Sequence, residues 1–448
     1  MASIVSANSA SAQKTPVPKY AAGISQHFPR PNKVRMLESS IASHQVMDVL
    51  PTNLGYNMRL ADKYVEFIIP GSVGSFIDLS KLILTLNIAL TKEDGTSIPD
   101  TKNVDVVNNI AQSLFKSVQC YLGDTVVETN VFYGYTSFVQ LCTTIAQSKI
   151  NTYCANTFTN LGGISSDKID DTYFTNLPAD RKKRIASLRK VGIQVCTPLT
   201  LEVCSVDRYL LDGIDVRIRL ELASDAWLVL AKDNADKIKV QINAAKLLYT
   251  KLFPYPNALL ALNSALDAGS VVQYTFTKNL VKSYILGENQ ISASYDLPYG
   301  SVIPEKLTLI MTKMESFAGA YNLNPLHFTS GNLSNITITV NGHSIYNVSA
   351  KFPEQYSELY YHTLDALGLH RDHLITYESF NKGLCVCVFD FKAENLEETL
   401  PVESYGNLRI NLTLSEATTE NRLVLLIGET LGIINVNSDR RIHCETRA

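Results

Sequence analysis

The chain has 448 residues, of which 46% are apolar and 19% are charged, and its formal net charge is −3. This length is enough for two or three domains with a sizeable apolar core, and the apolar content excludes a mostly disordered chain. The near balance of 43 acidic and 40 basic side chains excludes a protein that coats nucleic acid over its whole surface. The charged fraction lies below the ~25% that is usual in soluble domains, which indicates surface that is buried against copies or partners. The sequence contains no apolar run of about 18 residues, so we expect no helix that spans a membrane.

Residues 1–59 are predicted to form an extended, basic N-terminal arm. Prolines interrupt any helix in this segment, and its apolar residues are sparse. Up to Leu37 the arm carries no acidic residue, and its basic residues are Lys14, Lys19, Arg30, Lys33 and Arg35. Two interpretations stay open, namely a solvated tail and an arm that contacts phosphate or a neighbouring subunit.

The amino terminus has no apolar segment typical of a secretory signal, so we expect no secretion by a signal peptide. The eight cysteines are spread along the chain without a C-x-x-C pair. We therefore expect reduced, mostly buried thiols in a protein made in a reducing compartment.

Beyond the arm, alternation of apolar and polar residues predicts a mainly β protein. The segment Leu82–Leu90 places an aliphatic residue at every second position, which predicts a long strand with one apolar face. Shorter stretches repeat this alternation at Val216–Leu222, Leu307–Met311, Ile336–Val340 and Leu408–Leu414. Strands with one apolar face are typical of antiparallel sheets that pack into β-sandwiches.

A few short helices are expected between the strands. Asn257 is predicted to cap a helix that runs through Leu266 and ends near Gly269. Helical spacing of apolar residues also occurs in 107–114, 138–145 and 359–367.

Two stretches share the same order of parts, which indicates an internal duplication. The segments 118–145 and 336–367 each read as strand, glycine turn, strand and amphipathic helix. The spacing between equivalent residues differs along the chain, which excludes a short-period repeat and fits two related domains with loops of different length. We therefore predict a first β-sandwich at 60–250, a second at 251–440 and a C-terminal tail at 441–448.

Motifs that carry chemistry are scarce. The sequence contains no Walker-type loop, no G-x-G-x-x-G after a strand, no G-x-S-x-G and no H-E-x-x-H, so we predict neither an enzyme nor a cofactor. His370 and His373 are a weak candidate for a metal site, because such sites need further convergent ligands. The alternative is that both histidines follow a helix that ends near Gly368 and face solvent. Cys385 and Cys387 lie on one face of a predicted strand and are expected to pack in the core.

The densest basic cluster comprises Arg181, Lys182, Lys183 and Arg184. It has three interpretations: a nuclear-import signal, a contact with nucleic acid, or a polar loop between strands. No aromatic residues alternate with these basic side chains, so stacking on bases is not supported. The loop is the favoured interpretation.

Four stretches of sequence carry a resemblance to a known family. They are Val65–Gly71 running into Phe76–Lys81, Val107–Phe115 leading to Tyr121–Asp124, Tyr209–Val216, and Tyr405–Arg409 followed by Gly432–Arg440. In this order, over about 60–443, the chain resembles the double-jelly-roll major capsid proteins of Polinton/Maverick elements and the related adintoviruses.

The resemblance implies a mainly β fold with two tandem eight-stranded jelly-roll sandwiches and a few short helices. It implies a homotrimer whose six sandwiches form a pseudo-hexameric capsomer, which tiles an icosahedral capsid around double-stranded DNA. The implied partners are other copies of this chain, penton and minor capsid proteins, and the packaged DNA. The implied location is the virion, assembled inside the host cell with the nucleus as one candidate compartment. The basic arm would lie at the base of the capsomer, toward the interior or an adjoining capsomer.

Two other functions stay open. Jelly rolls also occur in lectins and enzymes, so a carbohydrate-binding or hydrolytic double-sandwich protein is one alternative. Such proteins usually carry a secretion signal, exposed aromatic residues near paired acids, or loops of metal ligands, and the sequence shows none of these. A host protein captured from a capsid gene is the other alternative, which the sequence does not separate from a viral protein.

Overall fold

The strands predicted from alternation form, and each buries its apolar face. The computed structural model describes residues 40–53, 64–160, 166–206, 208–232, 237–299, 302–369, 371–392 and 405–445. In β3 (Phe76–Lys92), the alternating aliphatic side chains from Leu82 to Leu90 are at most 1% exposed. Their burial stabilises the fold by on the order of 10 kcal/mol. The other predicted strands are β8 (Val216–Leu222), β13 (Lys306–Lys313), β14 (Leu333–Val340) and β17 (Leu408–Leu414).

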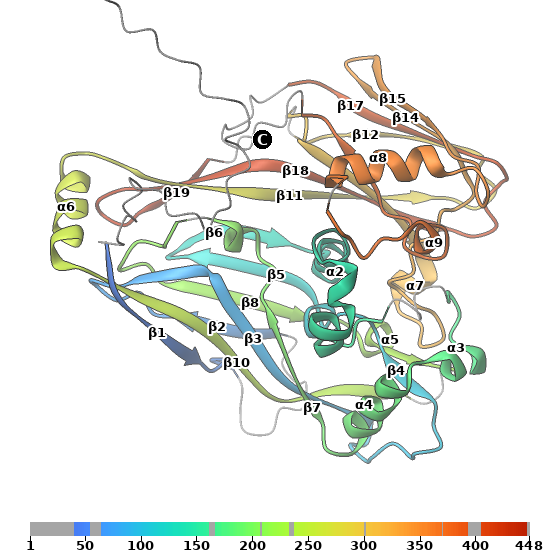
Figure 1. Ribbon diagram of the computed structural model, residues 1–448, viewed down its shortest axis with the longest axis horizontal. Helices are drawn as coiled ribbons and strands as arrows, with labels where there is room; N and C mark the ends of the chain where they lie inside the picture. Colours follow the sequence, from blue (N-terminus) through green and yellow to red (C-terminus); the bar gives the residue numbers. More distant parts are fainter. Residues whose placement is uncertain are drawn as a thin grey trace, which may run out of the picture. The chain divides into compact units, whose positions relative to one another are not determined.

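The strands pair into antiparallel sheets, two from each half of the chain (Figure 1). In the first half, one sheet has the order β1 (Ile41–Val49), β10 (Ile238–Pro254), β3 and β7 (Ile193–Pro198), and the other has β2 (Tyr64–Ile69), β8, β5 (Phe115–Leu122) and β6 (Thr125–Asn130). In the second half, the orders are β11 (Val272–Leu286), β18 (Arg422–Val436), β13 and β16 (Cys387–Asp390), then β12 (Ser292–Leu297), β17, β14 and β15 (His343–Ser349). Two further strands, β4 (Val104–Val106) and β9 (Val229–Ala231), pair with each other, and β19 (Ile442–Glu445) pairs with β18.

Both halves have the same topology. Leaving β4, β9 and β19 aside, each half of the described chain contributes eight strands to two four-stranded sheets. When these strands are numbered in chain order within each half, the sheet orders are 1-8-3-6 and 2-7-4-5 in both halves. This is the jelly-roll arrangement, so the predicted fold of two tandem jelly rolls is confirmed.

The duplicated segments occupy equivalent places in the two sandwiches. β5, a tight turn, β6 and α2 (Tyr133–Thr144) correspond to β14, a tight turn, β15 and α8 (Ser357–Leu367). The turn glycines Gly123 and Gly342 have φ of 55° and 82°, a left-handed conformation that favours glycine. The connection that follows α2 carries α3 (Asp171–Asn176) and α4 (Ala179–Lys190), whereas the one that follows α8 carries only α9 (Tyr377–Asn381) among the described residues. This difference explains why the spacing between equivalent residues is not constant.

The remaining helices are short. They are α1 (Ile110–Ser113), α5 (Asp225–Leu228), α6 (Pro256–Asp267), α7 (Met314–Ala318), the 3₁₀ turns η2 (Gln147–Lys149) and η5 (Glu202–Ser205), and a π-helical turn η3 (Ile150–Cys154). α6 confirms the predicted helix between the sandwiches, but Asn257 is not its cap. The N-cap is Tyr255, with Pro256 at the first helical position, where its fixed φ and missing N–H fit a helix start.

Strands occur in two segments that were expected to be an arm and a tail. Ile41–Val49, assigned to the arm, forms β1 and pairs with β10 at the edge of a sheet. Most of its side chains are exposed, so it lacks the apolar alternation that revealed the other strands. The predicted tail also contains a strand, because β19 pairs with β18.

Residues Ser40–Ala448 pack as one compact unit. The division at 250/251 therefore stays a prediction about separate domains. The basic residues of the arm that precede Ser40, namely Lys14, Lys19, Arg30, Lys33 and Arg35, lie outside the described residues.

Candidate functional site

The predicted metal site gains no support from its described member. His370 lies outside the described residues, and His373 is buried rather than facing solvent. The Nδ1 atom of His373 lies 2.8 Å from the carbonyl oxygen of Thr143, which ties the loop before α9 to the end of α2. Among the described residues, no three His, Cys, Asp or Glu side chains come together as a metal site. The core position predicted for Cys385 and Cys387 is confirmed, because both are at most 2% exposed, with their Sγ atoms 3.8 Å apart.

The basic cluster is helical, so the prediction of a loop is wrong. Its residues lie on α4, whose good helix formers carry Ile185 and Leu188 on one buried face. Lys182 and Lys183 are exposed on this helix. The guanidinium of Arg184 lies 3.9 Å from the centre of the Phe158 ring, a cation–π contact.

Arg181 is buried in a hydrogen-bonded network rather than presented to a partner. Its Nε donates to Asp105 Oδ2 at 2.8 Å, and its second terminal nitrogen donates to the Val106 carbonyl at 2.7 Å. The Tyr173 hydroxyl donates to the same Asp105 carboxylate at 2.7 Å. Burial, and then the Asp105 charge, raise the pKa of Tyr173. This network anchors α3 and α4 to β4, so Arg181 has a structural role, and an import or nucleic-acid contact by the rest of the cluster stays a prediction.

A buried pair of carboxyl groups lies where the first sandwich meets the second. Glu128 on β6 and Glu202 on η5 are 3% and 8% exposed. The backbone N–H of Glu202 donates to Glu128 Oε2 at 2.8 Å. The N–H of Asn279, on β11 of the second sandwich, donates to Glu202 Oε1 at 2.7 Å. The two acids therefore link β6, η5 and β11 in one chain of hydrogen bonds.

Both acids, Glu128 and Glu202, keep their protons to a higher pH than an exposed carboxyl group does. Burial, and then the neighbouring Glu202, raise the pKa of Glu128 well above its ordinary value. Burial also raises the pKa of Glu202 to about 7, against the opposing effect of the Asn279 N–H. Uncharged acids avoid the desolvation cost of two carboxylates in a shared apolar setting.

Other polar contacts also join the two sandwiches. The hydroxyl of Tyr274, on β11, accepts from the Leu211 N–H at 2.9 Å and donates to the Tyr209 carbonyl at 3.1 Å. Arg440 donates to Asp212 Oδ1 at 2.6 Å. The first and second halves are thus fixed to each other by buried and half-buried hydrogen bonds.

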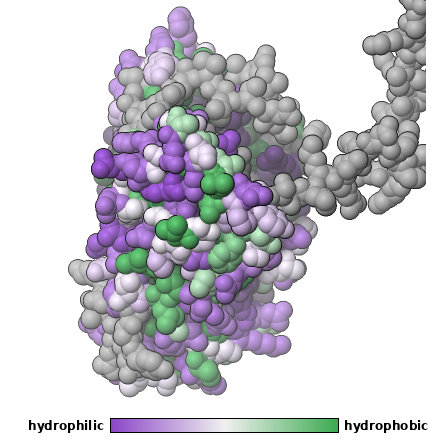
Figure 2. Space-filling view, turned by 90° about the vertical axis from the view of Figure 1, so that its left-hand side faces the viewer, coloured by the Kyte–Doolittle hydropathy of each residue, from purple (hydrophilic) through white to green (hydrophobic). Residues whose placement is uncertain are grey.

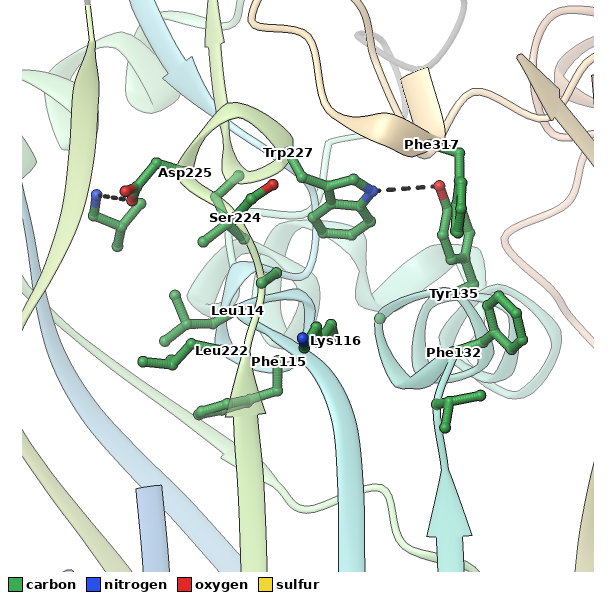
Figure 3. Close-up of a pocket in the computed structure, with 15 residues that line it drawn as sticks. Leu114, Phe115, Lys116, Phe132, Tyr135, Leu222, Ser224, Asp225, Trp227 and Phe317 are labelled. Carbon is green, nitrogen blue, oxygen red and sulfur yellow. Dashed lines mark hydrogen bonds between the residues drawn. The ribbon is translucent and has the colours of Figure 1, made fainter. Parts of the chain in front are cut away.

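A cleft opens at another point where the halves meet. Its walls come from the start of α2, the segment between β8 and α5, and α7 of the second half (Figure 3). The volume is about 560 Å³. Aromatic rings of Phe115, Phe132, Tyr135, Trp227 and Phe317 line much of it.

The surface displays apolar side chains in separate patches. Figure 2 shows the side of the molecule on which α6 lies, with apolar residues scattered among polar ones. Leu260 of α6 is 68% exposed, and Val73 is 91% exposed. Within the described residues, no helix is long and apolar enough to cross a lipid bilayer.

Comparisons with known proteins decide the fold. No model of a known protein family matches the chain. Among solved structures, a chain of the Sputnik virophage is similar over 96% of this chain and 92% of its own length, with 10% identity and a TM-score of 0.64. The VP54 protein of PBCV-1, fitted into a reconstruction of Sputnik, gives 11% identity and a TM-score of 0.57 over 93% of this chain and 100% of that one. The Faustovirus major capsid protein gives 9% identity and 0.53 over 94% of each chain. This is the double-jelly-roll fold.

A curated relative adds sequence similarity without a function. An uncharacterised protein of Caenorhabditis elegans is 20% identical over 292 residues, which are 62% of this chain. The chain spans 66% of the length of that relative.

The sequence did not predict the polar groups that join the sandwiches of the double jelly roll. Glu128 and Glu202 are 74 residues apart in the chain, and Asn279 acts through its backbone, which no motif reports. Asp105 and Arg181 are likewise far apart in the chain. The sequence marked Arg181 only as a member of a basic cluster. A charged residue within an otherwise apolar segment, such as Asp105 between Val104 and Val106, was the one available signal.

Proposed function

We propose that this chain is a major capsid protein, a structural subunit that assembles with copies of itself into the lattice of a virus capsid. The observation that carries the proposal is the repeated jelly roll within one chain, with a fold like that of the Faustovirus major capsid protein over 94% of each chain. Two similar outlines in one polypeptide let three copies present six similar sandwiches around an axis. A function of this kind lies in surface shape and needs no catalytic residues.

The finer proposal is a homotrimer that forms a pseudo-hexameric capsomer of the Polinton/Maverick and adintovirus type. The four sequence stretches that resemble this family support it. In this proposal the partners are further trimers, penton and minor capsid proteins, and packaged double-stranded DNA. The protein resides in the virion, which is assembled inside the host cell, and the nucleus is the proposed compartment of assembly. The separate apolar patches on the surface, including Leu260 and Val73, supply area for contacts between copies.

The test is to purify the full chain, measure its solution mass by light scattering and image it by electron microscopy. We expect trimers and, at high concentration or ionic strength, closed shells or sheets of hexagonal units. A stable monomer that forms neither would refute the proposal. Specific binding on a glycan array without self-assembly would favour a carbohydrate-binding protein instead.

The arm has its own test. Deleting residues 1–39 should leave trimers intact and impair shell formation, because the described sandwiches begin at Ser40. The matched control replaces Lys14, Lys19, Arg30, Lys33 and Arg35 by glutamine at full length. If both variants fail to form shells, the charge of the arm is what shell formation requires. If only the deletion fails, the length of the arm is what matters. If both variants form shells like the wild type, the arm has no role in shell formation.

A further inference from the structure

We propose that the cleft between α2, α5 and α7 binds a single-chain amphiphile with a carboxylate head, of the fatty-acid class. This binding goes beyond capsid assembly and does not depend on it. The cleft volume of about 560 Å³ falls within the range of ~300–1,000 Å³ that is usual for small-molecule sites. Because its walls come from both halves of the chain, a bound ligand would also join the two sandwiches.

One wall of the cleft is aromatic and has its polar groups paired internally. Tyr135 and Trp227 meet edge to face with their ring centres 5.6 Å apart, and Phe317 lies 6.1 Å from Tyr135. The indole N–H of Trp227 donates to the Tyr135 hydroxyl at 3.3 Å, as the dashed line in Figure 3 shows. This wall therefore presents ring surface to the cleft and favours an apolar chain over a polar ligand.

Small residues keep the cleft open. Gly134, at the start of α2, has no side chain, and a Cβ there would lie 3.1 Å from the Trp227 ring. Ala223 and Ser224 line the opposite side, between β8 and α5. Larger side chains at these positions would occupy the space that the ligand needs.

A cation lies at the same cleft. The Lys116 side chain is 54% exposed, and its Nζ lies 2.9 Å from Glu221 Oε1. An exposed ion pair of this kind contributes little free energy, so the Lys116 ammonium remains able to bind a second carboxylate. Two charged residues, Lys116 and Asp225, line the cleft. The Asp225 carboxylate accepts from the backbone N–H of Val240 at 3.0 Å, whereas the Lys116 ammonium is held by an exposed ion pair alone, which is why the head is assigned as an anion.

The sequence supplies a direct reporter of binding. Trp227 is the single tryptophan of the 448 residues, so emission excited at a wavelength that the 22 tyrosines hardly absorb comes from the cleft. The experiment titrates the full chain with dodecanoate and, separately, with dodecanol, both below their aggregation limits. We expect a saturable change in emission with both, and contact quenching of Trp227 by dodecanoate brominated along its chain.

Three variants separate the parts of the proposal. Gly134→Leu fills the cleft and should abolish binding of both ligands. Lys116→Met should weaken dodecanoate about tenfold and leave dodecanol unchanged, because it removes a charge-assisted contact. Lys382→Met is the matched control: this lysine is 58% exposed and also pairs with a glutamate, at 2.6 Å, but it is the C-cap of α9 and does not line the cleft. It should change neither titration.

Several outcomes would overturn the assignment. They are emission that does not saturate, brominated dodecanoate that fails to quench wild-type Trp227, and an equal effect of Lys116→Met and Lys382→Met. Dodecanoate binding that is lost as the protein concentration rises would show that a second copy fills the cleft, and would equally refute the proposal. The quenching measurement uses the wild-type chain, so the test stands even if Gly134→Leu does not fold.

Discussion

Raising the pH should lower the free energy of unfolding, because Glu202 ionises where the two sandwiches meet, and Glu202→Gln should remove this effect. The folded chain holds the proton of this buried acid up to about pH 7, whereas the unfolded chain releases it near its ordinary value of 4.5. A raised folded-state pKa means that the associated stability is complete below about pH 4.5 and is lost as the pH rises to about 7. Glu202 is only 8% exposed, so its pKa shift can be converted into a free energy of unfolding without a large correction for screening by solvent.

The magnitude follows from the difference between the two pKa values. Each pKa unit corresponds to about 1.4 kcal/mol, so the full loss is about 3 kcal/mol. Glutamine resembles the protonated acid in shape, and its carbonyl oxygen can still accept from the Asn279 N–H. The variant should therefore exceed the wild type by about 1 kcal/mol at pH 5 and by about 3 kcal/mol at pH 8. Glu128 is present in both proteins, and removal of the neighbouring Glu202 charge lowers the folded-state pKa of Glu128, which acts in the same direction.

The assay is urea unfolding of both proteins at pH 5 and pH 8, followed by circular dichroism and by the emission of Trp227. Glu354→Gln, at an exposed position, is the control and should leave the difference between the two pH values unchanged. If the free energy of unfolding changes between pH 5 and pH 8 by the same amount in the wild type and in Glu202→Gln, the carboxyl pair does not control the contact between the sandwiches. That result would refute the reasoning.

Three further perturbations test other parts of the fold. Asp105→Ala should destabilise the chain by about 3–5 kcal/mol in urea unfolding, because it leaves Arg181 buried without its partner, and a loss below 1 kcal/mol would contradict this. Gly432→Ala should lower the melting temperature, since a Cβ there would lie 2.6 Å from the Phe276 ring, and Phe276→Leu should restore part of the loss; no recovery would show that the ring is not the obstacle. The Cys387 thiol, 1% exposed, should not react with a thiol reagent until the chain is unfolded, whereas reaction in the native protein would place it at the surface.

The predictions that succeeded rest on local patterns with a physical cause. In β3 and β17, side chains of one face alternate with those of the other, so burial of one face leaves a period of two in the sequence. α8 was visible for the same reason, because its apolar residues recur with helical spacing before Gly368. β1 was missed since an edge strand with exposed side chains leaves no such pattern.

The amino-acid sequence by itself determined the strands, the repeated order of parts and the mainly β character, because each of these follows from burial along a single element. Tertiary structure alone decided which distant groups meet: Glu128 with Glu202, Asp105 with Arg181, Tyr135 with Trp227, and Tyr135 with Phe317 of the other half. Such contacts depend on how the sheets and loops are placed in space, and nothing in the spacing of residues along the chain specifies that placement.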